Sequence, residues 1–187
     1  MTRRRRKNKR WTALLKRIPK DAEWSGVEVG VFAGATLFQL LKNRPHLEMF
    51  GVDPWVPGSG SNMRDAGNWT RARWDQLYSS VQANSRLYPR RCSLLRMTSE
   101  RASVALMGWF DFVFIDGLHD YQSVLRDIEL WWPHVRRGGF LSGHDYSGGP
   151  GKHPGVKQAV DEWLSRGDNQ NLKLELDFDH TWFIRKP

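Results

Sequence analysis

The chain has 187 residues, of which 40% are apolar and ten are Trp, so it suits one packed domain and not a disordered chain. Its net charge of +9 is concentrated in residues 1–20, which carry ten Lys or Arg and no acid. The remaining residues, 21–187, hold 19 basic and 20 acidic side chains, which excludes a uniformly basic body. We predict a basic N-terminal arm with a short helix at 1–20 and a single domain at 21–187.

The arm has two interpretations. Its basic residues, 3–10, form most simply a solvated tail, and the alternative is electrostatic attachment to RNA, DNA or an anionic surface. No apolar stretch approaches the length of a membrane span, and the basic start lacks the long apolar segment of a secretory signal. The single cysteine, Cys92, excludes an internal disulfide and indicates a reducing compartment, so we predict a cytoplasmic protein.

Along the body, short apolar runs of strand character alternate with apolar residues at helical spacing. The predicted helices cover residues 11–18, 35–44, 69–85, 99–107, 121–135 and 153–166. The predicted strands cover residues 27–31, 47–53, 92–97, 111–116, 139–145, 172–178 and 181–186. Ser99 is a candidate N-cap, and Gly138 with Gly139 is the expected turn before a strand. The pattern predicts an α/β fold with a mainly parallel sheet that closes with an antiparallel hairpin.

The segment VEVGVFAGATLFQLL, residues 27–41, carries the first functional motif. Gly30 and Gly34 stand four apart after Glu28, which is neither the G-x-G-x-x-G of a dinucleotide site nor a P-loop. About twenty residues later Asp53 ends the second apolar run, where a carboxylate can accept both hydroxyls of a ribose. The segment therefore indicates a nucleotide-type site, with an ordinary turn built on structural glycines as the alternative.

Polar residues gather after each of the five predicted parallel strands, where the carboxyl ends of the strands meet at one edge of the sheet. They are Glu28 to Gly34, then Asp53, then Ser99 and Glu100, then Asp116 to Tyr121, and His144 to Tyr146. An acid follows four of the five runs, which favours an active site at this edge. The long loop at 54–68 is a candidate lid over it.

The pattern E-x-G-x-x-x-G followed by a ribose acid resembles class I S-adenosylmethionine-dependent methyltransferases. The later run FVFIDGLHDYQSVLRDIELWWPHVRRGGFLSGHDY, followed by HPGVKQAVDEWL, is similar to the family that includes macrocin-type sugar O-methyltransferases and cephalosporin-hydroxylase-like proteins. The resemblance spans roughly residues 27–164. It implies a Rossmann-like, doubly wound, seven-stranded sheet with helices on both faces and its last strand antiparallel.

The resemblance also implies how the cofactor, S-adenosylmethionine, is bound. It would lie across the first two strands, with Asp53 at the ribose and Ser99 at the adenine. Glu28, Gly30 and Gly34 would flank the methionine part, and Phe32 and Asp116 are further candidate cofactor-binding residues.

Several relatives hold a divalent metal with a carboxylate after the fourth strand and a polar pair after the fifth. Asp116 matches the first position, and His144 with Asp145 matches the pair. Bound Mg²⁺ would lower the pKa of an acceptor hydroxyl and aim its oxygen at the methyl group. His144 departs from the pattern, because relatives often have Asp or Glu there and imidazole suits transition metals better. Both a metal site and a metal-free site stay open.

His119, three residues after Asp116, is the candidate general base, because an unperturbed imidazole is neutral and accepts a proton. The alternative is a structural role as a helix cap or a partner of nearby backbone. Among the other histidines, only His153 is expected to face the site. Trp55 opens the long loop and is a candidate for stacking on a ligand, with core packing as the alternative.

Three functions compete. The first is a small-molecule O-methyltransferase, and the second is a ribose methyltransferase of RNA or other nucleic acid recruited by the arm. Base methylation is disfavoured, because Asp116-Gly117-Leu118-His119 is not the Asn/Asp-Pro-Pro-aromatic tetrapeptide and Cys92 starts a strand, away from the site. The third is a cofactor-binding protein without methyl transfer. An apolar helix or hairpin edge is a candidate surface for a homo-oligomer.

Overall fold

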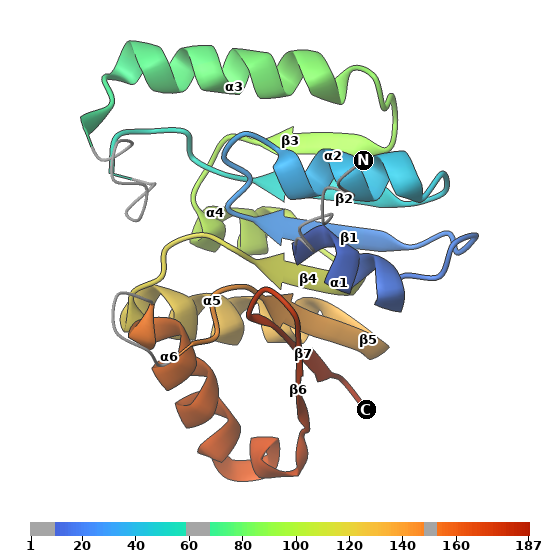
Figure 1. Ribbon diagram of the computed structural model, residues 1–187, viewed down its shortest axis with the longest axis vertical. Helices are drawn as coiled ribbons and strands as arrows, with labels where there is room; N and C mark the ends of the chain where they lie inside the picture. Colours follow the sequence, from blue (N-terminus) through green and yellow to red (C-terminus); the bar gives the residue numbers. More distant parts are fainter. Residues whose placement is uncertain (1–9, 59–67, 148–152) are drawn as a thin grey trace, which may run out of the picture.

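Seven short apolar runs form one sheet in the computed structural model, which describes residues 10–58, 68–147 and 153–187 (Figure 1). The strands are β1 Ser25–Val29, β2 Glu48–Val52, β3 Cys92–Leu95, β4 Phe110–Ile115, β5 Val135–Gly143, β6 Leu174–Asp177 and β7 Thr181–Arg185. Their order is β3-β2-β1-β4-β5-β7-β6, with β1 to β5 parallel and β7 antiparallel to both of its neighbours. This is the predicted sheet and closing hairpin.

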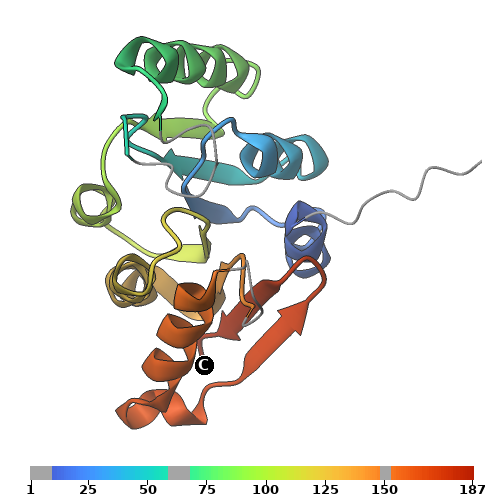
Figure 2. The ribbon, with the colours of Figure 1, turned by 60° about the vertical axis from the view of Figure 1, so that its left-hand side comes forward.

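Helices cover both faces of the sheet. They are α1 Arg10–Arg17, α2 Ala35–Asn43, α3 Arg71–Ser85, α4 Ser99–Ala105, α5 Tyr121–Trp131 and α6 Pro154–Ser165. Successive residues of β4 point to opposite faces, so Phe112 and Phe114 pack with α1, α2 and α3, whereas Val113 and Ile115 pack with α4, α5 and α6. Figure 2 shows α1 and α2 on one side of the sheet and α4 and α5 on the other. The central strands are therefore buried on both faces.

Two local predictions are wrong. The N-cap of α4 is Thr98, whose side chain accepts a hydrogen bond from the Arg101 amide, and Ser99 is the first helical residue. Gly138 and Gly139 lie inside β5 and not before it, because the strand begins at Val135 and its register against β4 shifts between Val135 and Phe140. A Cβ at Gly139 would lie 2.5 Å from the carbonyl oxygen of Asp111, so the two strands approach there at a distance that only glycine allows.

The short N-terminal helix α1 is packed into the domain. Ala13, Leu14 and Ile18 are fully buried in the core cluster that also contains α2. Lys16 and Arg17 form ion pairs with Asp177 at the end of β6, at 2.9 and 2.8 Å. The division at residue 20 stays a prediction, and residues 3–9 of the arm lie outside the described residues. No helix in the described part of the chain has the length and apolar character needed to cross a membrane.

Candidate active site

The carboxyl ends of the parallel strands are joined to one another by backbone hydrogen bonds. The Gly30 amide donates to the carbonyl of Val52 at 2.8 Å, and the Asp116 amide donates to the carbonyl of Val29 at 2.8 Å. The His144 amide donates to the carbonyl of Ile115 at 3.2 Å. The turns after β1, β4 and β5 therefore form one continuous edge, on which the predicted site residues stand.

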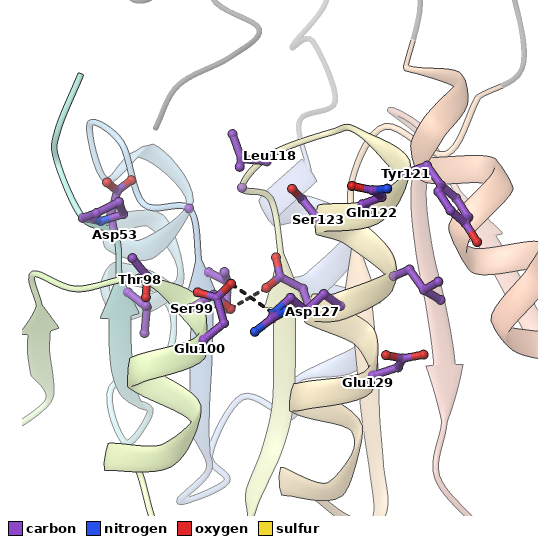
Figure 3. A pocket seen from close by; sticks show the side chains of 17 residues that line it. Asp53, Thr98, Ser99, Glu100, Leu118, Tyr121, Gln122, Ser123, Asp127 and Glu129 are labelled. Carbon is purple, nitrogen blue, oxygen red and sulfur yellow. Dashed lines mark hydrogen bonds and ion pairs between the residues drawn. The ribbon is translucent and has the colours of Figure 1, made fainter. Parts of the chain in front are cut away.

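A cleft of about 630 Å³ opens at this edge between α4 and α5 (Figure 3). Its walls come from the ends of β1 and β2, from the start of α4, and from the turn after β4 with α5. Three predicted cofactor residues line it, namely Gly30, Asp53 and Ser99. The lining residues of the other elements include Pro54, Thr98, Glu100, Gly117, Leu118 and Asp127. The other predicted cofactor residues do not line the cleft, although each lies within four positions of a residue that does; they are Glu28, Phe32, Gly34 and Asp116.

The turn after β1 depends on glycine. Gly30 has φ +89°, and a Cβ on it would lie 2.3 Å from the carbonyl oxygen of Asp116, so the turns after β1 and β4 approach closely there. Gly34 caps α2 in the left-handed region, at φ +76°. Glu28 is 2% exposed, and its Oε2 has no hydrogen-bond partner among the described residues. Burial raises the pKa of Glu28 well above its ordinary value, and the nearby Asp116 carboxylate raises it further.

Asp53 holds the turns after β1 and β2 together. Its two carboxylate oxygens accept hydrogen bonds from the Phe32 amide at 2.9 Å and the Trp55 amide at 2.7 Å. Burial raises the pKa of Asp53, although both amides oppose the shift. Trp55 is fully buried, its indole nitrogen donates to the carbonyl of Phe32 at 2.9 Å, and its ring packs on Tyr78. The expectation that Trp55 stacks on a ligand is therefore wrong, because the core encloses its ring.

Ser99 takes part in a buried polar network at the base of the cleft. Its hydroxyl donates to Oδ1 of Asp127 at 2.5 Å and accepts from the indole nitrogen of Trp131 at 2.8 Å. Asp127 was missed by the reasoning from sequence, although a signal was present. It occupies an apolar-face position of α5, between the buried residues Val124 and Ile128, and an acid at such a position requires a partner.

Four side chains from the turns after β4 and β5 converge beside the cleft. Nε2 of His119 lies 2.7 Å from Oδ2 of Asp145 and 3.8 Å from Oδ1 of Asp116. Nδ1 of His144 lies 2.9 Å from the same oxygen of Asp145, an ion-pair contact without the angle of a hydrogen bond. Potential ligand atoms of Asp116, His144 and Asp145 all lie within 4.8 Å of one another. The structure thus brings together the predicted metal and base residues, whose roles remain predictions.

The protonation of His119 differs from the expectation. Burial alone would favour the neutral ring, but the carboxylates of Asp116 and Asp145 outweigh it and raise the pKa of His119 to about 9. The ring therefore holds a proton at neutral pH in this arrangement, and the expected unperturbed imidazole is wrong. Burial disfavours the charge on Asp145, but His119 and His144 overcome it and hold the pKa of that carboxyl well below its ordinary value.

Two further residues reach the cluster. Arg10, the first residue of α1, forms an ion pair with Oδ2 of Asp116 through its Nη1, a contact that no sequence pattern indicated. The ring of His153, just before α6, lies 4.4 Å from that of His119 between centroids, as expected for the histidine that faces the site. Asp145 itself has φ +61°, a left-handed conformation that is uncommon for a residue with a Cβ. Such backbone often marks a functional position.

Comparison with known proteins identifies the family of the chain. A family model described as "Methyltransferase domain" matches residues 27–146. Uncharacterized protein R132 of Acanthamoeba polyphaga mimivirus is 28% identical over 158 residues, which cover 80% of this chain and 65% of that protein's length. The chain therefore spans slightly less than two thirds of this relative.

Two solved structures share the fold. An rRNA methylase from Streptococcus thermophilus has a TM-score of 0.60 at 14% identity, covering 94% of this chain and 93% of that one. The MycE methyltransferase of the mycinamycin biosynthetic pathway, in complex with Mg, SAH and mycinamycin VI, has a TM-score of 0.57 at 17% identity. That alignment covers 88% of this chain and 45% of MycE. Because the family match covers more than half of the residues, the chain belongs to this family of methyltransferase domains, as the resemblance to class I methyltransferases implied.

Proposed function

We propose that the protein transfers a methyl group from S-adenosylmethionine to a hydroxyl of a small molecule, with the help of a divalent metal. The observation that carries the proposal is the adjacency of two compartments. Gly117 lines the cleft, and the preceding residue, Asp116, belongs to the cluster of carboxylates and histidines. A methyl donor in the first compartment would therefore place its reactive end near acid, base and metal ligands in the second.

The cleft suits the proposed cofactor. A volume of about 630 Å³ is in the range of sites for ligands of this size. Asp53 stands in its wall at the end of β2, where a ribose would meet a carboxylate. Oε2 of Glu28, buried without a hydrogen-bond partner among the described residues, is an acceptor close to the turn where the amino-acid part of the cofactor would lie. The residues present therefore fit an adenosine-containing methyl donor.

The cluster fits a divalent metal held by Asp116, His144 and Asp145. Nδ1 of His144 is buried, lies 2.9 Å from Oδ2 of Asp145 and 3.9 Å from Oδ1 of Asp116, and makes no hydrogen bond within the described residues, so it can serve as a ligand atom. Such an ion would lower the pKa of an acceptor hydroxyl and hold its oxygen in place. A nitrogen ligand beside two carboxylates favours a transition metal over Mg²⁺, the ion that MycE contains.

His119 would receive the proton of the acceptor hydroxyl. Its ring stands between Asp116 and Asp145, which orient it and, while no cation balances their charge, keep it protonated. Positive charge at these two carboxylates would lower the pKa of His119 and allow it to act as a base. Asp116 and Asp145 would thus serve both as ligands and as the groups that position the base.

Ribose methylation of RNA is the second candidate, and the observation that favours it is the basic segment before Arg10. Residues 3–9 lie outside the described structure, whereas Arg10 reaches the cluster through Asp116. Base methylation through cysteine is disfavoured, because Cys92 begins β3 and burial raises the pKa of its thiol to about 11. The cytoplasmic location and a homo-oligomer stay predictions.

The proposal is tested first by calorimetry with S-adenosylhomocysteine (SAH) on the full chain. Methyl transfer from S-adenosylmethionine to sugars and other hydroxyl compounds is then followed by mass spectrometry, with and without a chelator. Asp116→Asn and Asp145→Asn should abolish turnover and nearly spare SAH binding. His119→Ala should cut the rate about 10²–10⁴-fold, the usual effect of removing a positioned base.

Each part of the proposal can fail separately. Binding of NAD in place of SAH would overturn the cofactor assignment, and turnover that is indifferent to chelators would overturn the metal. Transfer to RNA but not to small hydroxyl compounds, lost on deletion of residues 1–9, would favour the second candidate. This deletion retains Arg10, so the contact with Asp116 is kept in the control.

A further inference from the structure

The base of the cleft carries a carboxylate that the proposed reaction does not use. Asp127, on α5, is 7% exposed and lines the cleft, so its small exposed area faces this space. Its Oδ1 accepts the hydroxyl of Ser99 at 2.5 Å. Among the described residues this is the only hydrogen-bond partner of the carboxyl group. Oδ2 is therefore an acceptor without a donor in the described part of the chain.

The second oxygen points toward the ligand space and not into the core. A Cβ on Gly117, which also lines the cleft, would lie 4.0 Å from Oδ2 of Asp127. Because Gly117 has no side chain, the space between the turn after β4 and this oxygen stays open. Figure 3 shows Asp127 and Ser99 facing each other across the base of the cleft, below Leu118 and away from Asp53.

The orientation of the carboxyl is fixed before a ligand arrives. Trp131 donates to Ser99 at 2.8 Å, and Ser99 donates to Asp127, so the chain of hydrogen bonds runs in one direction toward the carboxylate. Trp131 is fully buried, so core packing holds the first donor of this chain of hydrogen bonds in place. A preorganised, desolvated acceptor discriminates strongly between ligands that carry a donor at its position and ligands that do not.

We infer that Asp127 recognises the adenine base, with Oδ2 accepting a hydrogen bond from the exocyclic amino group. The inference rests on the proposed function, since it requires an adenosine-containing methyl donor in this cleft. With the ribose at Asp53 on one wall, the base extends toward the wall formed by α4 and α5, where Asp127 stands. Asp127 is thus a specificity-determining residue for the cofactor.

The ionisation of Asp127 supports the assignment and gives it a signature. Burial raises the pKa of Asp127 to about 7, with smaller contributions of the same sign from Glu100 and Asp120, whereas Ser99 and Arg126 oppose the shift. An amino group prefers the ionised carboxylate as its acceptor. A carbonyl oxygen in the same place, as in hypoxanthine, prefers the protonated carboxyl as a donor.

The test uses two ligands, SAH and S-inosylhomocysteine, in which a carbonyl oxygen replaces the exocyclic amino group and the neighbouring N1 becomes an N–H donor. Calorimetry with the wild-type full chain should give about tenfold to a hundredfold tighter binding of SAH at pH 8. The ratio of the two affinities should fall as the pH is lowered through about 7, where Asp127 takes up a proton. The amino-acid part is common to both ligands, so its ionisation cancels in the ratio.

Asp127→Asn supplies the second measurement, because its amide still accepts the Ser99 hydroxyl and presents an NH₂ group to the cleft. It should lower the affinity ratio to one or below and remove its pH dependence. Asp168→Asn, an exposed acid outside the cleft with the same change in charge, should leave the ratio as in the wild type. Ser99→Ala should keep a preference for SAH, because the carboxylate remains.

A ratio near one in the wild type, or an unchanged ratio in Asp127→Asn, would overturn the inference while the proposed cofactor stands. If Ser99→Ala alone abolished the preference, Ser99 and not Asp127 would be the group that recognises the base. Failure of the wild type to bind either ligand would overturn the proposed cofactor together with the inference.

Discussion

Replacing Gly30 by Ala tests the close approach of the turns after β1 and β4. The new Cβ would lie 2.3 Å from the carbonyl oxygen of Asp116, 2.5 Å from its carbonyl carbon and 2.5 Å from Cα of Gly117. All three atoms belong to the backbone, so no rotation of a side chain relieves the overlap. One of the two turns must move by about 1 Å to restore ordinary contact.

The magnitude has two parts. At φ +89° an L-residue costs about 1–2 kcal/mol relative to glycine, and forced overlap in a packed region adds about 1–3 kcal/mol. Gly138→Ala isolates the first part, because Gly138 has φ +75° and its Cβ would meet only the end of Arg136, at 3.9 Å. We therefore expect Gly30→Ala to destabilise the protein by about 2–5 kcal/mol and Gly138→Ala by about 1–2 kcal/mol.

The assay is urea unfolding of both variants and the wild type, followed by tryptophan fluorescence and far-UV circular dichroism at one pH. Coincident transitions by the two probes justify a two-state analysis. SAH binding by the folded Gly30→Ala variant should also weaken, since its backbone lines the cleft. Equal loss of stability in the two variants would refute the reasoning, because the overlap would then contribute nothing.

Three further predictions concern charged side chains. Because burial raises the pKa of Asp127 to about 7, the folded protein binds a proton there that the unfolded chain has already lost. The stability of the wild type relative to Asp127→Asn should therefore fall as the pH rises, by roughly 1.4 kcal/mol per pH unit between about pH 4.5 and 6.5. Urea unfolding across that range measures it, and a constant difference would contradict the shift. Arg10→Gln should tighten Mn²⁺ binding about fivefold in calorimetry, because the half-exposed Arg10 guanidinium would no longer compete with the metal for Asp116. An unchanged Mn²⁺ affinity would exclude this competition. Arg17→Ala should lower the free energy of unfolding in urea by about 1–2 kcal/mol, because its contacts with the C-terminal hairpin are lost. A decrease no larger than that of the exposed control Lys20→Ala would show that these contacts add no stability.

The sequence by itself determined the class of fold and the edge of the sheet at which the site lies. Alternating strand and helix patterns specify parallel strands, and parallel strands place their carboxyl ends together. The acids and histidines that follow β4 and β5 therefore had to meet, and Asp116, His119, His144 and Asp145 do so. Gly30 was also predictable, because a turn that brings two backbones together requires a residue without a Cβ.

Only the tertiary structure decided which side chains touch across the layers. Arg10 and Asp116 are 106 positions apart, and their contact depends on how α1 packs on the sheet, which no local pattern encodes. Asp127 reaches Ser99, 28 positions away, only because α4 and α5 lie side by side. Burial of Trp55 and the raised pKa of His119 likewise follow from neighbours that the fold assembles. Periodicity fixes the faces of helices and strands, whereas contacts and ionisation depend on the three-dimensional environment.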